Sequence, residues 1–121
     1  MRFRVKSIKP GYCEVWANER DGGRYGLVAN VKKVHDKDWY WSPSETPQLL
    51  LGPFTARATC IRDCKRTALM RLVEHAIEQQ PKESPHWLSP RRYAMFDVNR
   101  SEVFTLEERE EIEKRLETFD E

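Results

Sequence analysis

The sequence has few of the features that mark secreted or membrane proteins. Its 121 residues include three cysteines, an odd number with no CxxC spacing, which argues against a disulfide framework. No run of about 18 apolar residues occurs, and the first residues alternate charged with apolar side chains, unlike a secretory signal. We therefore expect a cytoplasmic protein that does not associate with membranes.

Motifs that indicate catalysis are also missing. The sequence has no Walker loop and no GxGxxG, GxSxG or HExxH motif. His35, Asp36 and Asp38 offer metal-binding atoms, but their spacing matches no closed site and a polar turn explains them more simply. Cys60 and Cys64 could bind a soft metal, yet buried cysteines commonly act as small hydrophobic residues. We expect no enzymatic activity and no cofactor.

Charge is abundant, at 34% of residues, and it is unevenly distributed. Residues 1–80 carry a net charge of +5, residues 81–104 of +1 and residues 105–121 of −5. The total of +1 therefore conceals a basic body and an acidic C-terminal segment. Such a division is typical of a surface for a charged partner, or of a pairing within the chain.

Period-2 alternation predicts antiparallel strands in the first half of the chain. The segments 2–8 and 12–18 show it, and residues 24–34 follow an Asp-Gly-Gly turn that suits a tight hairpin. The aromatic residues 39–41 favour another short strand, since bulky rings pack well on a pleated surface. The strand side chains expected on the core side are Phe3, Val5, Cys13, Val15, Ala17, Tyr25, Leu27, Ala29 and Val31.

The period becomes helical after Thr55, a residue suited to cap a helix N-terminus. A broad apolar face runs from Ile61 to Ala76, and Pro81 cannot continue the helix, so we predict that it ends near Gln80.

Two further segments follow the predicted long helix. Residues 81–104 contain three prolines, and we expect an extended segment pinned on the core, with a short strand over 92–98. Thr105 and Glu108 form a capping box that opens an acidic helix within residues 105–121. The expected fold is α+β in a single domain: an antiparallel sheet of three to five strands packed on one long helix, plus an acidic C-terminal helix.

Cations and aromatic rings share the face of the predicted sheet opposite the core. Guanidinium groups there can meet phosphates while rings stack on bases, or the cations can simply solvate the face and protect an edge strand. Arg62 and Arg66 form a second basic stripe at the start of the long helix, where an anion could bind. The candidate binding residues are Arg2, Arg4, Lys6, Tyr12, Trp16, Arg24, Lys32, Arg62 and Arg66.

The acidic helix carries a narrow apolar stripe of Ile112, Leu116 and Phe119. An amphipathic stripe needs a partner, and the basic body of the same chain is the favoured one. A second copy is the alternative, which leaves both a monomer and a homodimer open.

The residues from 12 to 78, with Gly52-Pro53-Phe54-Thr55 leading into the long helix, resemble small sheet-plus-helix modules of phage and prophage accessory proteins. They also look like the sheet-and-helix DNA-binding domains of the AP2 and integrase type. The resemblance implies a compact, nonenzymatic protein that acts by binding. We therefore expect an accessory protein with a protein partner, anchored by aromatic side chains. The alternative is a nucleic-acid-binding module in which the acidic tail competes for the basic surface.

Overall fold

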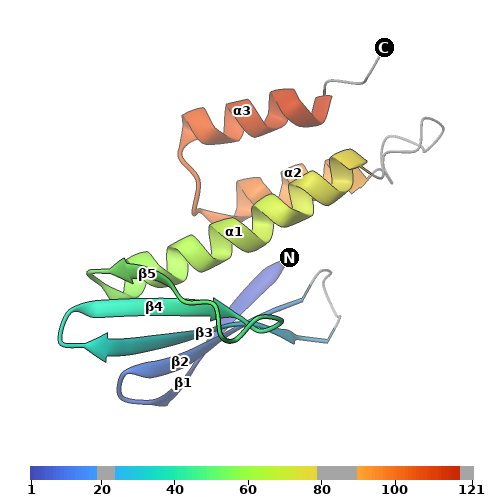
Figure 1. Ribbon diagram of the computed structural model, residues 1–121. Helices are drawn as coiled ribbons and strands as arrows, with labels where there is room; N and C mark the ends of the chain where they lie inside the picture. The colour runs from blue at the N-terminus through green and yellow to red at the C-terminus, as the bar shows by residue number, and fades with distance from the viewer. Residues whose placement is uncertain (19–23, 79–89, 118–121) are drawn as a thin grey trace. The chain divides into compact units, whose positions relative to one another are not determined.

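The computed structural model describes residues 1–18, 24–78 and 90–117 (Figure 1). Their elements are β1 (Arg2–Lys9), β2 (Tyr12–Asn18), β3 (Gly26–His35), β4 (Asp38–Pro43), β5 (Leu51–Phe54), α1 (Arg57–Glu78), α2 (Pro90–Ser101) and α3 (Leu106–Glu117). The strands form one antiparallel sheet in the order β1-β2-β3-β4-β5. The α+β prediction is confirmed, including the long helix α1. Within the described ranges, no helix is long and apolar enough to cross a membrane.

The chain divides into two compact units, residues 1–65 and 66–121, and the division falls within α1. The first unit has twelve Lys and Arg against seven Asp and Glu, a net charge of +5. The second has nine against thirteen, a net charge of −4.

The core of the first unit lies between one face of the sheet and the start of α1. Alternation in β2 and β3 directs Cys13, Val15, Ala29 and Val31 to this face, and the α1 side chains that pack on them include Cys60. These strand side chains are at most 1% exposed. Fully burying a residue such as Val contributes about 1.5–3 kcal/mol, so this face holds α1 on the sheet.

A β-bulge in β3 changes which side chains reach that core. Val15 pairs with Ala29, but the next residue, Trp16, pairs with Leu27, so Val28 is an extra residue. Val28 packs against the core, whereas Leu27 lies beside Trp16 on the opposite face. The expected inward orientation of Leu27 is therefore wrong, because one inserted residue reverses the alternation.

A second bulge lies in β1. Ser7 pairs with Cys13, and Lys9 pairs with Tyr12, which leaves Ile8 as the extra residue. Lys9 thereby joins Tyr12 on the face away from the core. Val5 was expected to be half-buried on the core side but remains 38% exposed, because β1 is an edge strand.

The connection from β4 to α1 depends on a glycine. Gly52 in β5 has φ +143°, and a Cβ there would lie 2.7 Å from the Trp39 carbonyl oxygen, so only glycine fits. The first helical bond of α1 runs from the Cys60 amide to the Ala56 carbonyl. The residue at the capping position is therefore Ala56 and not Thr55. The predicted Thr55 cap is wrong, because the turn after β5 delays the helix start.

The strand predicted over residues 92–98 is wrong, because α2 covers them. Pro90 occupies the first helical position, where a missing amide removes no helical hydrogen bond. The buried side chains of α2 are Arg91, Ala94, Asp97 and Val98, which recur at helical and not at strand spacing. The preceding residues 81–89 of the predicted extended segment lie outside the described residues.

The capping box of α3 is confirmed. The Glu108 amide donates to Thr105 Oγ1 at 3.2 Å, and the Thr105 amide donates to Glu108 Oε1 at 2.9 Å. Two orphan amides at the helix start are satisfied reciprocally, which explains why α3 begins at Leu106.

Candidate functional site

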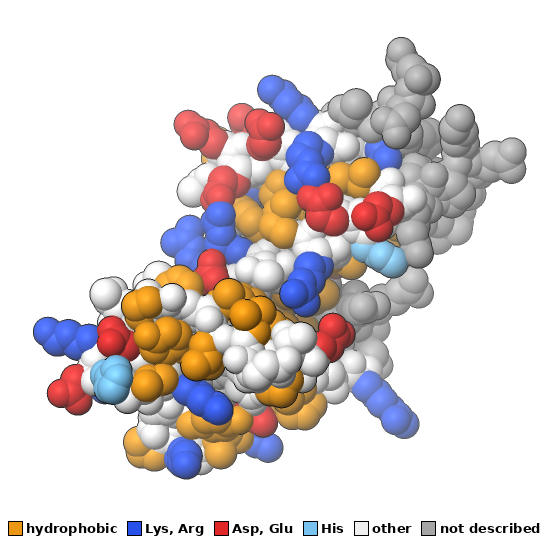
Figure 2. All heavy atoms as spheres, viewed as in Figure 1, with side chains coloured by type: hydrophobic (Ala, Val, Ile, Leu, Met, Phe, Trp, Pro, Cys, Tyr) orange, Lys and Arg blue, Asp and Glu red, His pale blue; other side chains and the backbone are white. Residues whose placement is uncertain are grey.

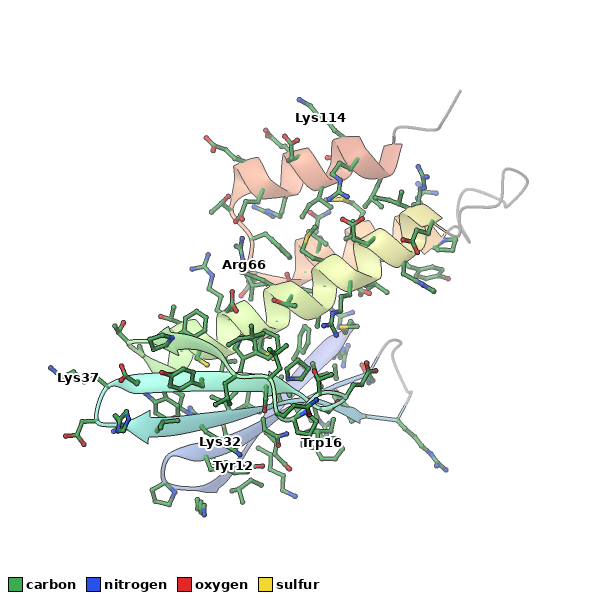
Figure 3. All side chains as sticks on the ribbon, viewed as in Figure 1. Tyr12, Trp16, Lys32, Lys37, Arg66 and Lys114 are labelled. Carbon is green, nitrogen blue, oxygen red and sulfur yellow. The ribbon has the colours of Figure 1, made fainter. Side chains whose placement is uncertain are left out.

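The strand register gathers most of the predicted binding residues on the face of the sheet opposite the core of the first unit. Arg4 pairs with Trp16, Lys6 with Glu14, and Tyr12 with Lys32, and paired residues share a face. Figure 3 shows Tyr12, Trp16 and Lys32 on the side of the sheet away from the start of α1. We call this surface of β1, β2 and β3 the cationic face. Its charged side chains are Arg2, Arg4, Lys6, Lys9, Glu14 and Lys32.

Hydrogen bonds fix two aromatic rings on the cationic face. Tyr12 donates its hydroxyl to Asn30 Oδ1 at 2.7 Å, and Trp16 donates its indole N–H to Glu14 Oε1 at 3.2 Å. Both rings are half-buried, so each is held in place while part of it remains accessible. The face therefore presents oriented rings among cations.

The cations on this face also contact rings. The Arg4 guanidinium lies 4.3 Å from the centroid of the Tyr25 ring, and Lys32 Nζ lies 5.9 Å from that of Tyr12. Tyr25, which was expected to point inward, is thus within reach of Arg4 on the cationic face. Cation–π contacts of this kind orient long side chains without neutralising their charge.

Two predicted binding residues do not join this face, and a third, Arg24, is exposed and precedes β3. Arg62 is exposed on α1, the helix that packs on the opposite side of the sheet. Arg66 belongs to the second unit and donates from both terminal nitrogens to the Glu108 carboxylate, and from Nη1 to the Val103 carbonyl at 3.0 Å. The basic stripe predicted on the long helix is therefore divided between the two units, and Arg66 is committed to α3.

The predicted stripe of α3 is used within the second unit. Ile112 and Leu116 are each 4% exposed, and an ion pair between Arg115 of α3 and Glu74 of α1 lies beside them. Phe119 lies outside the described residues. Figure 2 shows red carboxylate side chains gathered over α3. The apolar side of α3 thus packs inside its own unit.

The sequence pattern missed Lys9, Tyr25 and Tyr40 as residues of this surface. Lys9 reaches it only through the bulge at Ile8, which has no clear signature in the sequence. Tyr40 pairs with Lys32, so simple alternation in the strand at residues 39–41 could have found it.

A groove of about 600 Å³ lies at one end of the cationic face, against the turn between β1 and β2. Lys9, Lys32 and Lys33 line it together with Tyr12, and none of its lining residues is acidic. The Lys33 amide donates to the Gly11 carbonyl at 2.8 Å, and this bond fixes the turn against β3. We call this hollow the turn groove.

The cysteines and the His35 turn provide no comparable site. Burial, assisted by the nearby Asp63 carboxylate, raises the pKa of the Cys60 thiol to about 12. Burial likewise raises the pKa of Cys64 to about 12, so both thiols stay protonated and neutral. Across the described ranges, no three His, Cys, Asp or Glu side chains gather where they could hold a metal ion.

Comparison with known proteins adds no further assignment, because no protein family, curated protein or solved structure matches the chain.

Proposed function

We propose that this protein binds single-stranded nucleic acid on the cationic face, without catalysing a reaction. The observation that carries the proposal is the alternation of cations with fixed aromatic rings on one sheet surface. Proteins that bind single strands combine a positive track for the phosphates with rings on which bases stack. The pairs Arg4 with Trp16 and Lys32 with Tyr12 supply both groups side by side.

The charge balance of this surface supports the same ligand. On the cationic face, five cations stand against one carboxylate, Glu14, and Glu14 accepts a hydrogen bond from Trp16. The first unit as a whole carries +5, which attracts a polyanion over a longer range than any single contact.

Fluorescence anisotropy of labelled single-stranded DNA and RNA tests the proposal. If five cations neutralise five phosphates, affinity should fall about a hundredfold between about 50 and about 200 mM salt. The double variant Arg4→Gln/Lys6→Gln should reduce the slope of log K against log salt by about 1.4. Trp16→Leu should weaken binding about tenfold at either salt concentration, because a stacking ring is lost.

The matched control is Lys37→Gln/Lys114→Gln, which removes two positive charges outside the cationic face (Figure 3). It should leave the salt slope within experimental error of the wild-type value. Absence of binding at the lower salt concentration, or equal slopes for the two double variants, would overturn the proposal.

A second candidate function, binding of a protein segment, is favoured by the edge of the sheet. β1 is an eight-residue edge strand, and Val5 and Ile8 are 38% and 46% exposed. An edge strand can pair with an extended peptide, and its row of Arg and Lys favours acidic residues at alternate positions. A labelled peptide of alternating Glu and Val should then bind, and its Lys and Val counterpart should not. Equal binding of both peptides would refute this candidate.

We also propose that the protein is a cytoplasmic accessory protein of the phage or prophage type. All three cysteines are free thiols, which suits a reducing compartment. A small binding protein agrees with the resemblance carried by residues 12–78.

A further inference from the structure

We infer that the turn groove binds a terminal phosphate group of a nucleotide, either at the end of a nucleic-acid strand or on a free nucleotide. For a nucleic-acid strand, this inference rests on the proposed function. It adds that the end of the cationic face binds the terminal phosphate of that strand. Of the residues that line the turn groove, only Tyr12 and Lys32 belong to the binding surface predicted from the sequence.

Like charge is concentrated at the turn groove. The residues that line its volume of about 600 Å³ include three lysines, Lys9, Lys32 and Lys33, and no acidic residue. Like charges brought together repel, and a bound anion removes that repulsion. A phosphate monoester carries about −1.5 to −2 at neutral pH, against −1 for a phosphodiester inside a strand, so the terminal group matches three cations better.

An aromatic ring lies next to these lysines. Tyr12 lines the same groove, and its hydroxyl is held by Asn30 at 2.7 Å, so the ring has a fixed position beside the lysines. A nucleotide has a flat base joined through a sugar to its phosphate, and a fixed ring next to cations can contact both parts. Inorganic phosphate alone would use only the lysines.

The position of the turn groove also suits the end of a strand. The turn groove lies where β1 ends and the chain reverses at Pro10 and Gly11. The bulge at Ile8 rotates Lys9 onto the same face as Tyr12, and the bond from the Lys33 amide to the Gly11 carbonyl closes the turn against β3. A strand that follows the cations of β1 therefore meets the turn at this end of the face.

The test compares three internally labelled oligonucleotides of one sequence, bearing a 5′-phosphate, a 3′-phosphate or no terminal phosphate. One phosphorylated form should bind the wild-type protein about tenfold more tightly than the unphosphorylated form, because charge-assisted contacts are added. Lys9→Gln/Lys33→Gln should abolish that ratio, whereas Lys37→Gln/Lys114→Gln should preserve it. A ratio of two dissociation constants is insensitive to a general loss of affinity.

Direct binding of ATP, measured by isothermal titration calorimetry, distinguishes the two sources of phosphate. If no oligonucleotide binds but ATP binds in a way that Lys9→Gln/Lys33→Gln abolishes, the groove inference stands for a free nucleotide and the proposed function fails. If all three oligonucleotides bind equally and ATP does not bind, the groove inference is overturned and the proposed function stands. A preference that persists unchanged in Lys9→Gln/Lys33→Gln also overturns the inference, and absence of all binding overturns both. Lys9 and Lys33 are exposed, so circular dichroism should report an unchanged fold.

Discussion

At the scale of single residues, Arg91 illustrates how one side chain can hold two helix ends. Its Nη1 donates to the Leu116 carbonyl at 2.9 Å and its Nη2 to the Ile77 carbonyl at 3.3 Å, while only 8% of the residue is exposed. These carbonyls lie in the last turns of α3 and α1, where a cation is favoured by the helix dipoles. Arg91 is thus a buried structural arginine.

We predict that Arg91→Lys destabilises the protein by about 2 kcal/mol, because a single ammonium group cannot reach both carbonyls with the fork geometry of arginine. Urea unfolding followed by circular dichroism measures this. Arg92→Lys is the matched control, since Arg92 is exposed, and it should change stability by less than about 0.5 kcal/mol. Equal effects of the two substitutions would contradict the assignment of Arg91.

At the scale of elements, the start of α3 depends on the ionisation of Glu108. The Arg66 guanidinium, followed by the Thr105 amide, lowers the pKa of Glu108 from 4.5 to about 2. A carboxyl whose pKa is lower in the folded state contributes stability above its unfolded pKa and loses it as pH falls through the folded pKa. This contribution should therefore be complete above about pH 5 and disappear between pH 4.5 and 2.

Glu108→Gln should remove that contribution and flatten the decline of the melting temperature in this acidic window. At neutral pH we expect a loss of about 1 kcal/mol, a modest value because about a third of each partner side chain is exposed. Melting followed by circular dichroism at several pH values provides the measurement. Glu110→Gln, an exposed position on the same helix, should retain the wild-type pH dependence. If Glu110→Gln flattens the curve equally, the capping contact is not the cause.

The elements also show how far the sequence carries a prediction. The strands at residues 2–8 and 12–18 and the capping box could be predicted, because alternation and capping are local signals. The sequence could not predict that Val28 faces the core and Leu27 the opposite side. The bulge that exchanges them depends on the pairing of Trp16 with a residue on another strand. The helix α2 was missed because prolines around it were interpreted as breakers, although Pro90 suits a first helical position.

In the candidate site too, local patterns were predictable from the sequence and long-range contacts were not. Strand alternation placed Arg2, Arg4 and Lys6 on the correct face, since β1 is regular up to Ser7. Arg66 was assigned to a binding stripe because helical spacing shows which side a residue occupies and not which partner it meets. Its partner Glu108 lies 42 residues away, and only the tertiary fold brings the two together.

At the scale of the whole molecule, burial of the apolar stripe of α3 within the second unit limits how two copies of the chain could form a dimer. Ile112 and Leu116 are buried there, so a dimer formed through this stripe would first have to expose them. Pairing of two β1 edges would bring the like charges of Arg2, Arg4 and Lys6 together. We therefore predict a monomer in sedimentation equilibrium, and a dimer mass at micromolar concentration would contradict this.

Gly52 has a consequence for mutational tolerance. Any side chain at this position meets the Trp39 carbonyl oxygen and the Tyr40 ring, so a library randomised at Gly52 should yield folded clones only with glycine. A library randomised at Lys9 and Lys33 should instead stay folded while its ligand affinity varies. Parallel selection for expression and for binding would thus sort the chain into positions that specify shape and positions that specify recognition.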